Sequence, residues 1–513
     1  SADRIAAHVR FLSDDLLEGR GVAARGEALA TLYIAGQFAQ LGLDPAGDNG
    51  TFFQRVPLVG IETLPASTLR VNTRSLKLLD EWVGVNHRQQ PDTPLDAAAV
   101  FVGHGIVAPE FQWNDYQGID VKGKWVVLFT NEPESADPQF FGGRALTYYG
   151  RWTYKYEEAT RQGALGCLIV HTDKTAGYGW NVVRNSWGGK QPLVKLAAGE
   201  PALAFAGWVS EPIGDQIFAS LGKSSQQLLQ QADTRGFQAL PLPRIRIPAR
   251  IQSGVTVLDT RNVVARLPGS DPQLQDEAVL YTAHHDHLGI GTPVNGDAIY
   301  NGAVDNATGC GILLETARAF AGLPSRTARS ILFAAVGAEE GGLRGSEYYG
   351  RRPAIPAGKH AVNLNYDGEF VFGRTSDITL NGYERTTLKN LVEQTARQLQ
   401  LTITPDPQPE QGHYYRSDHF SLARVGIPAI TVSQGDDYVG KPPGWGQKAF
   451  QEYNEKHYHQ PSDQFDPNWD FSGLAQLARF GFELGLQVAN KRSLPTWQPG
   501  DEFLPAREKS WKR

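Results

Sequence analysis

The segment AVLYTAHHDHLG, residues 278–289, begins as an apolar run and ends in three histidines around one aspartate. A short apolar run bounded by a polar cluster is typical of a buried strand. Histidines at the end of a strand can simply cap backbone groups or lie in solvent, so this segment alone does not establish a site. The rest of the chain decides whether His284, His285, Asp286 and His287 have partners for chemistry.

Beyond about residue 255, apolar strand-like runs alternate with helix-like runs. In chain order they are EAVLYTA (277–283), GCGILLETARAFAGL (309–323), RSILFAAV (329–336), LRGSEYYGR (343–351), HAVNLNY (360–366), TTLKNLVEQTARQLQ (386–400) and IPAITVS (427–433). Near-continuous apolar strands that alternate with helices are typical of a parallel sheet buried on both faces. The fold class is therefore predicted to be α/β, with a mostly parallel sheet sandwiched by helices.

Upstream of this region the pattern of apolar residues differs between two successive parts of the chain. Residues 1–20 and 25–43 place apolar residues at helical spacing, which predicts two amphipathic helices. A β-rich region with Gly, Pro and Trp-rich loops follows. We therefore predict a first segment of the α/β domain at 1–61, an inserted β-rich domain with its linkers at 62–250, a main segment of the α/β domain at 251–490 and a C-terminal surface tail at 491–513.

Length and composition exclude several classes of protein. A chain of 513 residues exceeds what one core usually organises. Its formal net charge of -6 gives no electrostatic footprint for nucleic acid or an anionic membrane, and no stretch approaches a membrane span of roughly 20 apolar residues. Cys167 and Cys310 lack metal-site spacing, so the sequence predicts no thiolate site, and one disulfide between them is possible but not favoured.

The predicted strands end in candidate metal ligands. In open α/β sheets the ligand site lies beyond the carboxyl ends of the strands, and these ends carry His284, the pair Glu339–Glu340, and Asp367. Two loops add Asp305 and His459. Imidazole and carboxylate ligands without thiolate are typical of a hydrolytic centre with two ions, about 3.5 to 4 Å apart and bridged by a carboxylate.

In this interpretation Asp305 bridges the ions. His284 and Asp367 complete the first ion, and Glu340 and His459 complete the second. Glu339 is then free to act as general base toward the attacking water.

Five ordered motifs resemble the di-zinc aminopeptidase family, which includes bacterial leucyl aminopeptidases and glutamate carboxypeptidases. The motifs are AHHDHLG (283–289), NGAVDNATGCG (301–311), AAVGAEEGGLRGS (334–346), NLNYDGEF (363–370) and YHQPSD (458–463). The resemblance covers roughly residues 1–60 and 255–490. It implies a zinc exopeptidase-like fold and two zinc ions, with other divalent metals possible. The implied ligands are His284, Asp305, Glu340, Asp367 and His459, with Glu339 as the base.

The family pattern also distinguishes among the residues of the opening segment. It reads His, any residue, Asp, which selects His284 and Asp286, and alternate residues of an extended segment point to the same side. Asp286 is expected to support the site from behind the ligands. His285 and His287 are expected to be bystanders or to line the pocket.

Two further segments resemble parts of the family. In YYRSDHFSLARVGIPAI (414–430), Tyr414 occupies a place where some relatives carry a tyrosine that stabilises the oxyanion, although packing is the alternative. Asp418 and His419 of that segment are expected to be structural. Residues 100–129 and 159–171 are similar to the protease-associated domain of several relatives, for which the default role is a lid or packing.

The leading prediction is a metal-dependent exopeptidase, most simply an aminopeptidase acting on peptides with a free N-terminus. A carboxypeptidase is less favoured because no Arg cluster is evident. The alternatives are an aminoacyl cyclase of the same fold, which uses a single zinc, and a non-catalytic receptor-like homologue. The resemblance and the start of the chain predict a periplasmic or secreted protein whose signal peptide has been removed. The sequence sets no oligomeric state.

Overall fold

The computed structural model describes residues 1–512, which divide into two compact units. The first contains Ser1–Pro57, Asp259–Pro407 and the chain from Arg416 onward, and the second contains Leu58–Leu258 and Gln408–Tyr415. The predicted boundaries at 61 and 250 fall inside strands β2 (Phe53–Thr63) and β13 (Leu240–Leu267), which continue from one unit into the other. The second unit also includes residues 408–415, which the sequence did not indicate.

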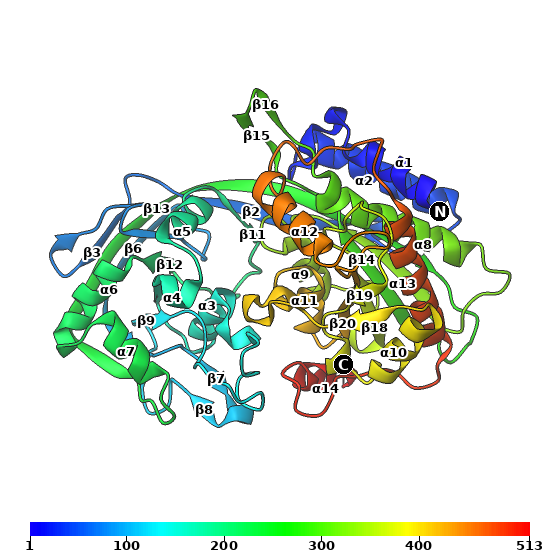
Figure 1. The fold of residues 1–513 in the computed structure, drawn as a ribbon. Coiled ribbons are helices and arrows are strands. Elements are labelled where there is room, and N and C mark those ends of the chain that lie inside the picture. The colour runs from blue at the N-terminus through cyan, green and yellow to red at the C-terminus, as the bar shows by residue number, and fades with distance from the viewer. Residues whose placement is uncertain (513) are drawn as a thin grey trace. The chain divides into compact units, whose positions relative to one another are not determined.

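The first unit has the predicted α/β sheet. Its strand order is β21 (Ala429–Thr431), β18 (His360–Asn365), β14 (Ala278–His284), β17 (Ser330–Val336) and the C-terminal part of β13 (Figure 1). The first four strands are parallel, and β13 pairs antiparallel with β17. The prediction of a mostly parallel sheet is confirmed.

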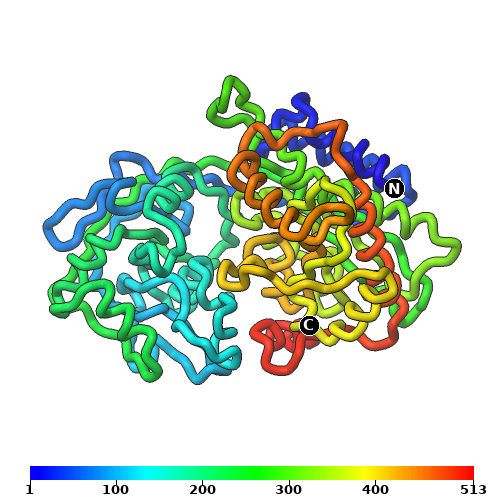
Figure 2. The backbone as a smooth tube through the Cα atoms, viewed as in Figure 1, coloured from blue at the N-terminus to red at the C-terminus, as the bar shows by residue number. Residues whose placement is uncertain are grey.

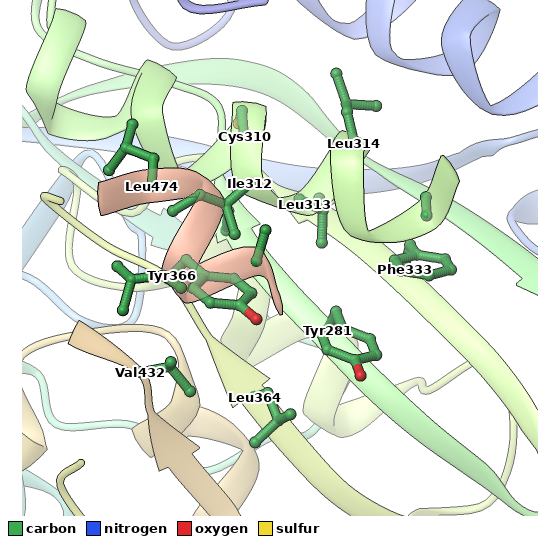
Figure 3. Close-up of a cluster of buried hydrophobic side chains, with 14 of the residues drawn as sticks. Tyr281, Cys310, Ile312, Leu313, Leu314, Phe333, Leu364, Tyr366, Val432 and Leu474 are labelled. Atoms are coloured by element: carbon green, nitrogen blue, oxygen red, sulfur yellow. The ribbon is translucent and has the colours of Figure 1, made fainter. Parts of the chain in front are cut away.

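Alternate residues of the central strands divide the core into two layers, as the pleat of a strand requires. Val279 and Tyr281 of β14 pack in the larger layer with helices α1 (Ala2–Leu12), α2 (Arg25–Gln40), α8 (Thr308–Ala321) and α13 (Ser472–Asn490). Leu280 and its neighbours pack on the other face with α9 (Arg344–Arg351) and α11 (His419–Ala423). Figure 3 shows part of the larger layer, in which Tyr281 and Phe333 of the sheet lie below α8. Helices thus cover both faces of this sheet.

The first unit departs from the prediction in two places. Residues 289–300 form a hairpin of β15 (Gly289–Val294) and β16 (Asp297–Tyr300), which projects from this unit (Figure 2). The expected surface tail instead contains helix α14 (Leu504–Trp511), and Trp497 and Arg507 are buried. Arg507 donates to the carbonyl groups of His360 and Pro495, which ties this segment to the body of the unit.

The remaining elements of the first unit are short. They are η1 (Asp15–Arg20), β1 (Asp44–Pro45), η2 (Asp48–Gly50), η6 (Ala303–Ala307), η7 (Ala357–Lys359), β19 (Asp377–Thr379), η8 (Tyr383–Arg385), α10 (Lys389–Gln398), β20 (Thr402–Thr404), β22 (Ser433–Gln434) and α12 (Trp445–Lys456).

The second unit is built on a sheet whose strand order is β13, β6 (Asp92–Phe101), β9 (Trp125–Phe129), β10 (Gly166–Val170), β12 (Phe205–Val209) and β5 (Trp82–Val85). Helices α6 (Glu211–Phe218) and α7 (Ser225–Ala232) pack on one face of this sheet, and α3 (Trp152–Arg161) and α5 (Trp180–Trp187) pack on the other. It therefore contains more helix than its β-rich sequence predicts. Its elements are β3 (Thr68–Val71), β4 (Arg74–Ser75), β5 (Trp82–Val85), β6 (Asp92–Phe101), β7 (Val107–Ala108), η3 (Pro109–Phe111), β8 (Trp113–Asn114), β9 (Trp125–Phe129), η4 (Tyr148–Gly150), α3 (Trp152–Arg161), β10 (Gly166–Val170), α4 (Asp173–Ala176), α5 (Trp180–Trp187), β11 (Gln191–Val194), β12 (Phe205–Val209), α6 (Glu211–Phe218), η5 (Ala219–Leu221), α7 (Ser225–Ala232), η9 (Pro409–Gln411) and η10 (His413–Tyr415).

The two cysteines are both buried and both free thiols, Cys167 in the second unit and Cys310 in the first. The alternative of a disulfide between them is therefore wrong. Among residues 1–512, none of the helices combines the length and the apolar character needed to cross a bilayer.

Candidate metal centre

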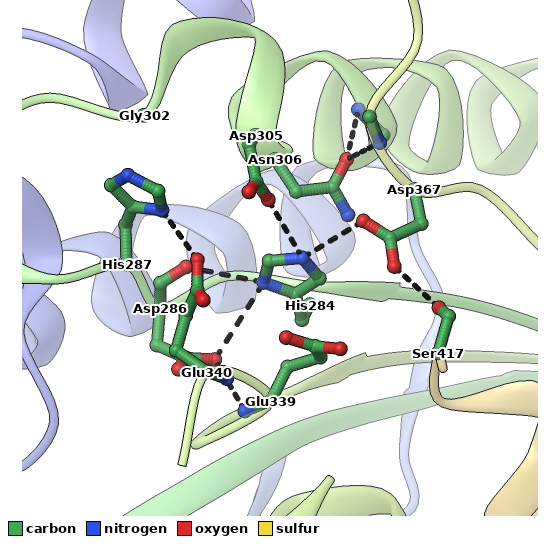
Figure 4. Close-up of polar contacts among 12 residues, drawn as sticks. His284, Asp286, His287, Gly302, Asp305, Asn306, Glu339, Glu340, Asp367 and Ser417 are labelled. Atoms are coloured by element: carbon green, nitrogen blue, oxygen red, sulfur yellow. Dashed lines mark hydrogen bonds and ion pairs between the residues drawn. The ribbon is translucent and has the colours of Figure 1, made fainter. Parts of the chain in front are cut away.

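The parallel strands of the first unit bring predicted ligands together at the carboxyl end of its sheet, where Figure 4 shows His284, Asp305, Glu340 and Asp367. His284 is the last residue of β14, and Asp367 follows β18 by two residues. Glu340 lies in the loop after β17, and Asp305 lies in η6, directly before α8. His459 comes from the loop after α12. Parallel strands end on the same side of a sheet, so these segments converge although they are far apart in sequence.

The first group of donor atoms is centred on His284. Its Nε2 lies 3.2 Å from Oδ1 of Asp305 and 3.0 Å from Oδ1 of Asp367. Its Nδ1 lies 3.2 Å from the carbonyl oxygen of Asp286. A proton on Nδ1 therefore leaves the lone pair of Nε2 facing the two carboxylates, which is the tautomer that a metal ligand requires.

The second group is centred on Glu340. Nε2 of His459 lies 3.3 Å from Oδ2 of Asp305 and 3.2 Å from Oε2 of Glu340. Nδ1 of His287 lies 2.6 Å from Oε1 of Glu340. Asp305 thus presents one carboxylate oxygen to each group, which is the arrangement of a bridging ligand.

The donor set fits two divalent cations. The ligand atoms of His284, Asp305 and Asp367 lie within 4.8 Å of one another, and the same holds for His287, Asp305 and Glu340. All donors are imidazole nitrogens or carboxylate oxygens, which suit zinc and related ions. Among the described residues, Oε1 of Glu340 and Nε2 of His459 are buried without a hydrogen-bond partner. Buried polar atoms of this kind need a partner, and a cation between them supplies one.

The electrostatics of the protein without metal show how strongly these groups interact. Burial alone would lower the pKa of His284, but Asp367, Glu339 and Asp305 outweigh it and raise that pKa well above its usual value. Burial would raise the pKa of Glu340, yet the His287 and His459 imidazoles bring it down to about 2. Burial would likewise raise the pKa of Asp305, but His284 and His459 hold it well below its usual value, so Glu340 and Asp305 are in the ionised form that binds cations.

Glu339 differs from its neighbour Glu340. Burial, reinforced by the charges of Asp367 and Glu340, raises the pKa of Glu339 well above its usual value against the opposing effect of His284. In Figure 4 its carboxylate lies beside the ring of His284. A carboxyl group with a raised pKa is suited to take up a proton during a reaction.

Asp286 holds the turn that carries both glutamates. It is fully buried, and its carboxylate accepts hydrogen bonds from the backbone N–H groups of Glu339 at 3.0 Å and Glu340 at 3.4 Å. The preceding Ala338 has φ of 55°, in the left-handed region that non-glycine residues rarely adopt. The hydrogen bonds to Asp286 stabilise this turn and so fix the direction of both glutamate side chains.

Two polar side chains position the other ligands. Oδ1 of Asn306 accepts from the backbone N–H groups of Gly309 and Gly368, which ties the Asp305 loop to the end of β18 (Figure 4). Ser417 donates a hydrogen bond to Asp367. These contacts restrain the carboxylates behind the donor atoms, as is usual around metal ligands.

Asp463 supports the bridging residue itself. Its carboxylate is 1% exposed and accepts hydrogen bonds from the backbone N–H groups of Val304 and Asp305 and from the Tyr453 hydroxyl at 3.0 Å. The motif YHQPSD contains this residue, but sequence alone does not show which loop it contacts.

We expect Asp463→Ala to weaken metal binding by about 10- to 100-fold, because the backbone of Asp305 loses its acceptor. Two buried N–H groups would also be left unpaired, at about 1–3 kcal/mol each, so the unfolding midpoint should fall. Tyr453→Phe, which removes only the phenol donor, is the matched control. Titration with zinc and thermal unfolding measure both effects, and unchanged affinity in Asp463→Ala would show that Asp463 does not position the bridge.

A buried arginine joins the segments that carry the ligands. Arg20 is 1% exposed, and its guanidinium donates to the carbonyl oxygens of His285 at 2.8 Å, Asn301 at 2.6 Å and Gly302 at 2.9 Å, and also to Leu12. It thereby links η1 to the loop after β14 and to the loop before Asp305. Sequence reasoning missed this residue because its partners are backbone carbonyl groups, and those of His285, Asn301 and Gly302 are more than 260 positions away.

The remaining predicted residues are placed as follows. Tyr414 is buried in the segment Gln408–Tyr415, which groups with the second unit, and its role at an oxyanion stays a prediction. Asp418 and His419 are both fully buried. His285 lies with Nε2 at 2.9 Å from the carbonyl oxygen of Arg261, away from the donor atoms. His287 instead contacts Glu340, because β14 ends at His284 and strand alternation no longer governs the direction of the next side chains.

Comparison with known proteins gives one family match and several relatives. Residues 262–479 match the profile of peptidase family M28. Leupeptin-inactivating enzyme 1 from Streptomyces exfoliatus is 28% identical over 213 residues, which cover 39% of this chain and 42% of that enzyme. The match therefore spans less than half of that relative.

Two solved structures align with most of this chain. An aminopeptidase from Aneurinibacillus sp. strain AM-1 aligns with a TM-score of 0.50 and 20% identity, covering 98% of this chain and 97% of that one. BSAP, a zinc aminopeptidase from Bacillus subtilis, aligns with a TM-score of 0.43 and 17% identity over 94% of each chain. The first of these alignments shows a shared fold.

Proposed function

We infer that this chain is a metal-dependent aminopeptidase that removes residues from the free N-terminus of peptides, because residues 262–479 match the profile of peptidase family M28. The observation that carries this inference is Asp305, whose two carboxylate oxygens face separate imidazole and carboxylate groups. The structure that aligns with a TM-score of 0.50 is that of an aminopeptidase, which agrees with the proposal.

We propose that His284, Asp305 and Asp367 hold one zinc ion and that Asp305, Glu340 and His459 hold the other. When bound, such ions polarise the scissile carbonyl group and lower the pKa of the attacking water. Other divalent metals accept the same ligands.

The protein's own groups then move the proton and orient the substrate. Glu339 takes the proton of the attacking water and later gives it to the leaving amine nitrogen, so the peptide bond breaks without releasing an amide anion. Asp286 keeps Glu339 in place through the backbone hydrogen bond described above.

The excess of carboxylates at the site suits an α-ammonium group better than a substrate carboxylate. The buried guanidinium of Arg20 donates its hydrogen bonds to backbone carbonyl groups and so does not offer a binding site for a C-terminal carboxylate. These features favour an aminopeptidase over a carboxypeptidase.

The test is hydrolysis of a panel of aminoacyl-anilides, their N-acetylated counterparts, and peptides with blocked or free C-termini. We expect turnover of substrates with a free N-terminus and none of the N-acetylated ones. Release of C-terminal residues from N-blocked peptides would instead establish a carboxypeptidase. Cyclisation of N-terminal glutaminyl peptides would establish the cyclase, and no turnover with metal present would favour the receptor-like reading.

We expect metal loading at pH 7 to release roughly two protons, because ligating imidazoles must be neutral. In the metal-free protein, burial lowers the pKa of His459 but Asp305 and Glu340 raise it to about 10, and the pKa of His284 is also raised. Both rings are therefore charged before metal binds, and affinity should fall as the pH falls. Calorimetric titration with zinc in buffers of different ionisation enthalpy counts the protons. Heat that does not depend on the buffer would contradict this.

We further propose that residues 62–250 form a protease-associated domain and that the enzyme acts in the periplasm or is secreted. The proposed domain is supported by the resemblance of residues 100–129 and 159–171 to protease-associated domains. The proposed location is supported by the same resemblance, because relatives that carry this domain are commonly exported. Fractionation of cells that express the complete gene tests the location. Activity confined to the cytoplasm would contradict it.

A further inference from the structure

His287 is a buried imidazole at the candidate metal centre for which the five-ligand scheme has no use. Its side chain is fully buried, and its Nδ1 lies 2.6 Å from Oε1 of Glu340. Its ring and that of His459 form an edge-to-face pair with centroids 5.6 Å apart. His287 thus lies on the same side of Glu340 and Asp305 as the second group of donor atoms.

The short contact between Nδ1 of His287 and Oε1 of Glu340 is an ion pair without the orientation of a regular hydrogen bond. Neither ring nitrogen of His287 has a hydrogen-bond partner among the described residues, and neither has Oε1 of Glu340. A ligand atom of each of His287, Asp305 and Glu340 lies within 4.8 Å of those of the other two, so one cation can contact all three residues. In a buried site, polar atoms without hydrogen-bond partners are costly unless another atom binds them.

The backbone of His287 is fixed by contacts with a neighbouring segment, whereas His459 lies in a partly exposed loop. The N–H group of His287 donates to the carbonyl oxygen of Arg20 at 3.3 Å, and His287 forms a parallel β-bridge with Gly21. His459, by contrast, has a side chain that is 35% exposed and a φ of 55° in a loop. Of these two histidines, His287 is therefore the one whose backbone position is set by neighbouring structure.

We propose that His287 is a third imidazole ligand of the centre, binding the second ion together with Asp305, Glu340 and His459. This proposal rests on the two-ion site of the proposed function. It makes the two ions unequal: the first has one imidazole and two carboxylates, and the second has two imidazoles and two carboxylates. Sites with four protein ligands are typical of structural zinc, whereas sites with three keep a position open for water or substrate.

The consequence is an order of binding. The second ion, with four protein ligands, binds first and more tightly, and the first ion exchanges more readily. A site in which His287 only positioned Glu340 through space would have three protein ligands for each ion and would give no such difference.

Proton NMR of the cobalt(II)-loaded protein tests the ligand directly. Each ligating imidazole contributes one exchangeable N–H signal that is strongly shifted by the paramagnetic ion. We expect three such signals in the wild-type protein, from His284, His459 and His287, and two in His287→Ala. His457→Ala is the matched control, because His457 lies in the same loop as His459 but its Nδ1 contacts Ser462. This variant should keep all three shifted signals.

Two shifted signals in the wild-type protein would overturn the proposal, and this count holds even if His287→Ala does not fold. Stepwise cobalt titration gives a second readout, in which His287→Ala should weaken the tighter step by at least about 10- to 100-fold. An unchanged tighter step in a folded variant would also overturn it. Absence of bound cobalt in the wild type would instead count against the two-ion site itself, so the two failures are distinguishable.

Discussion

Glu339→Gln is expected to lower kcat by about a hundred- to ten-thousand-fold, the usual contribution of a positioned general base. The amide keeps the size of the side chain but cannot take a proton from the attacking water. Glu340 and the other proposed ligands are untouched, so the metal content should stay at the wild-type value. Steady-state kinetics with an aminoacyl-anilide and elemental analysis of the same samples measure both quantities.

A matched control is Glu347→Gln, which removes a carboxylate of α9 that pairs with Arg344 and Arg351. Its kcat should remain near that of the wild type, because Glu347 is not among the groups of the centre. A Glu339→Gln enzyme that turns over normally would remove Glu339 from the role of base. A variant that loses metal as well as activity would identify Glu339 as a ligand.

Asp305→Ala is expected to abolish binding of both ions together, because one carboxylate serves both groups of donor atoms. Metal ions contribute several kcal/mol of transition-state stabilisation, so activity should fall by about a thousand-fold or more. Loss of a ligand that served only one ion would leave the other ion bound. Metal content per chain, measured after gel filtration, separates these two outcomes.

Asp297→Asn in the hairpin β15–β16 is the control, since Asp297 contacts Gln464 and lies outside the donor groups. It should keep its metal and its activity. Retention of one ion by Asp305→Ala would contradict the bridging role.

The fold of the first unit was predictable because its strands are buried on both faces. That burial makes β14, β17 and β18 continuous apolar runs, and the carboxyl ends of parallel strands bring their last residues together. The positions of His284 and Asp367 followed from this rule. The hairpin β15–β16 was missed although its turn, Asn295–Gly296, has the dipeptide that commonly closes a two-residue hairpin.

Other parts of the site depend on contacts that no local pattern encodes. His287 contacts Glu340 because the chain leaves the strand at His284, and Arg20 reaches backbone carbonyls of two distant loops. Asp463 accepts hydrogen bonds from backbone N–H groups, and no sequence pattern indicates which backbone groups a carboxylate will contact. The burial of Arg507 likewise comes from carbonyl acceptors, which the proline-rich C-terminal sequence does not reveal.

The most direct measurement of the central claim is a crystal structure of the zinc-loaded protein with anomalous diffraction data collected on both sides of the zinc absorption edge. The account predicts two zinc peaks in the first unit, both contacted by Asp305, with His284 and Asp367 at one and Glu340 and His459 at the other. A single peak, or two peaks that do not share Asp305, would contradict it.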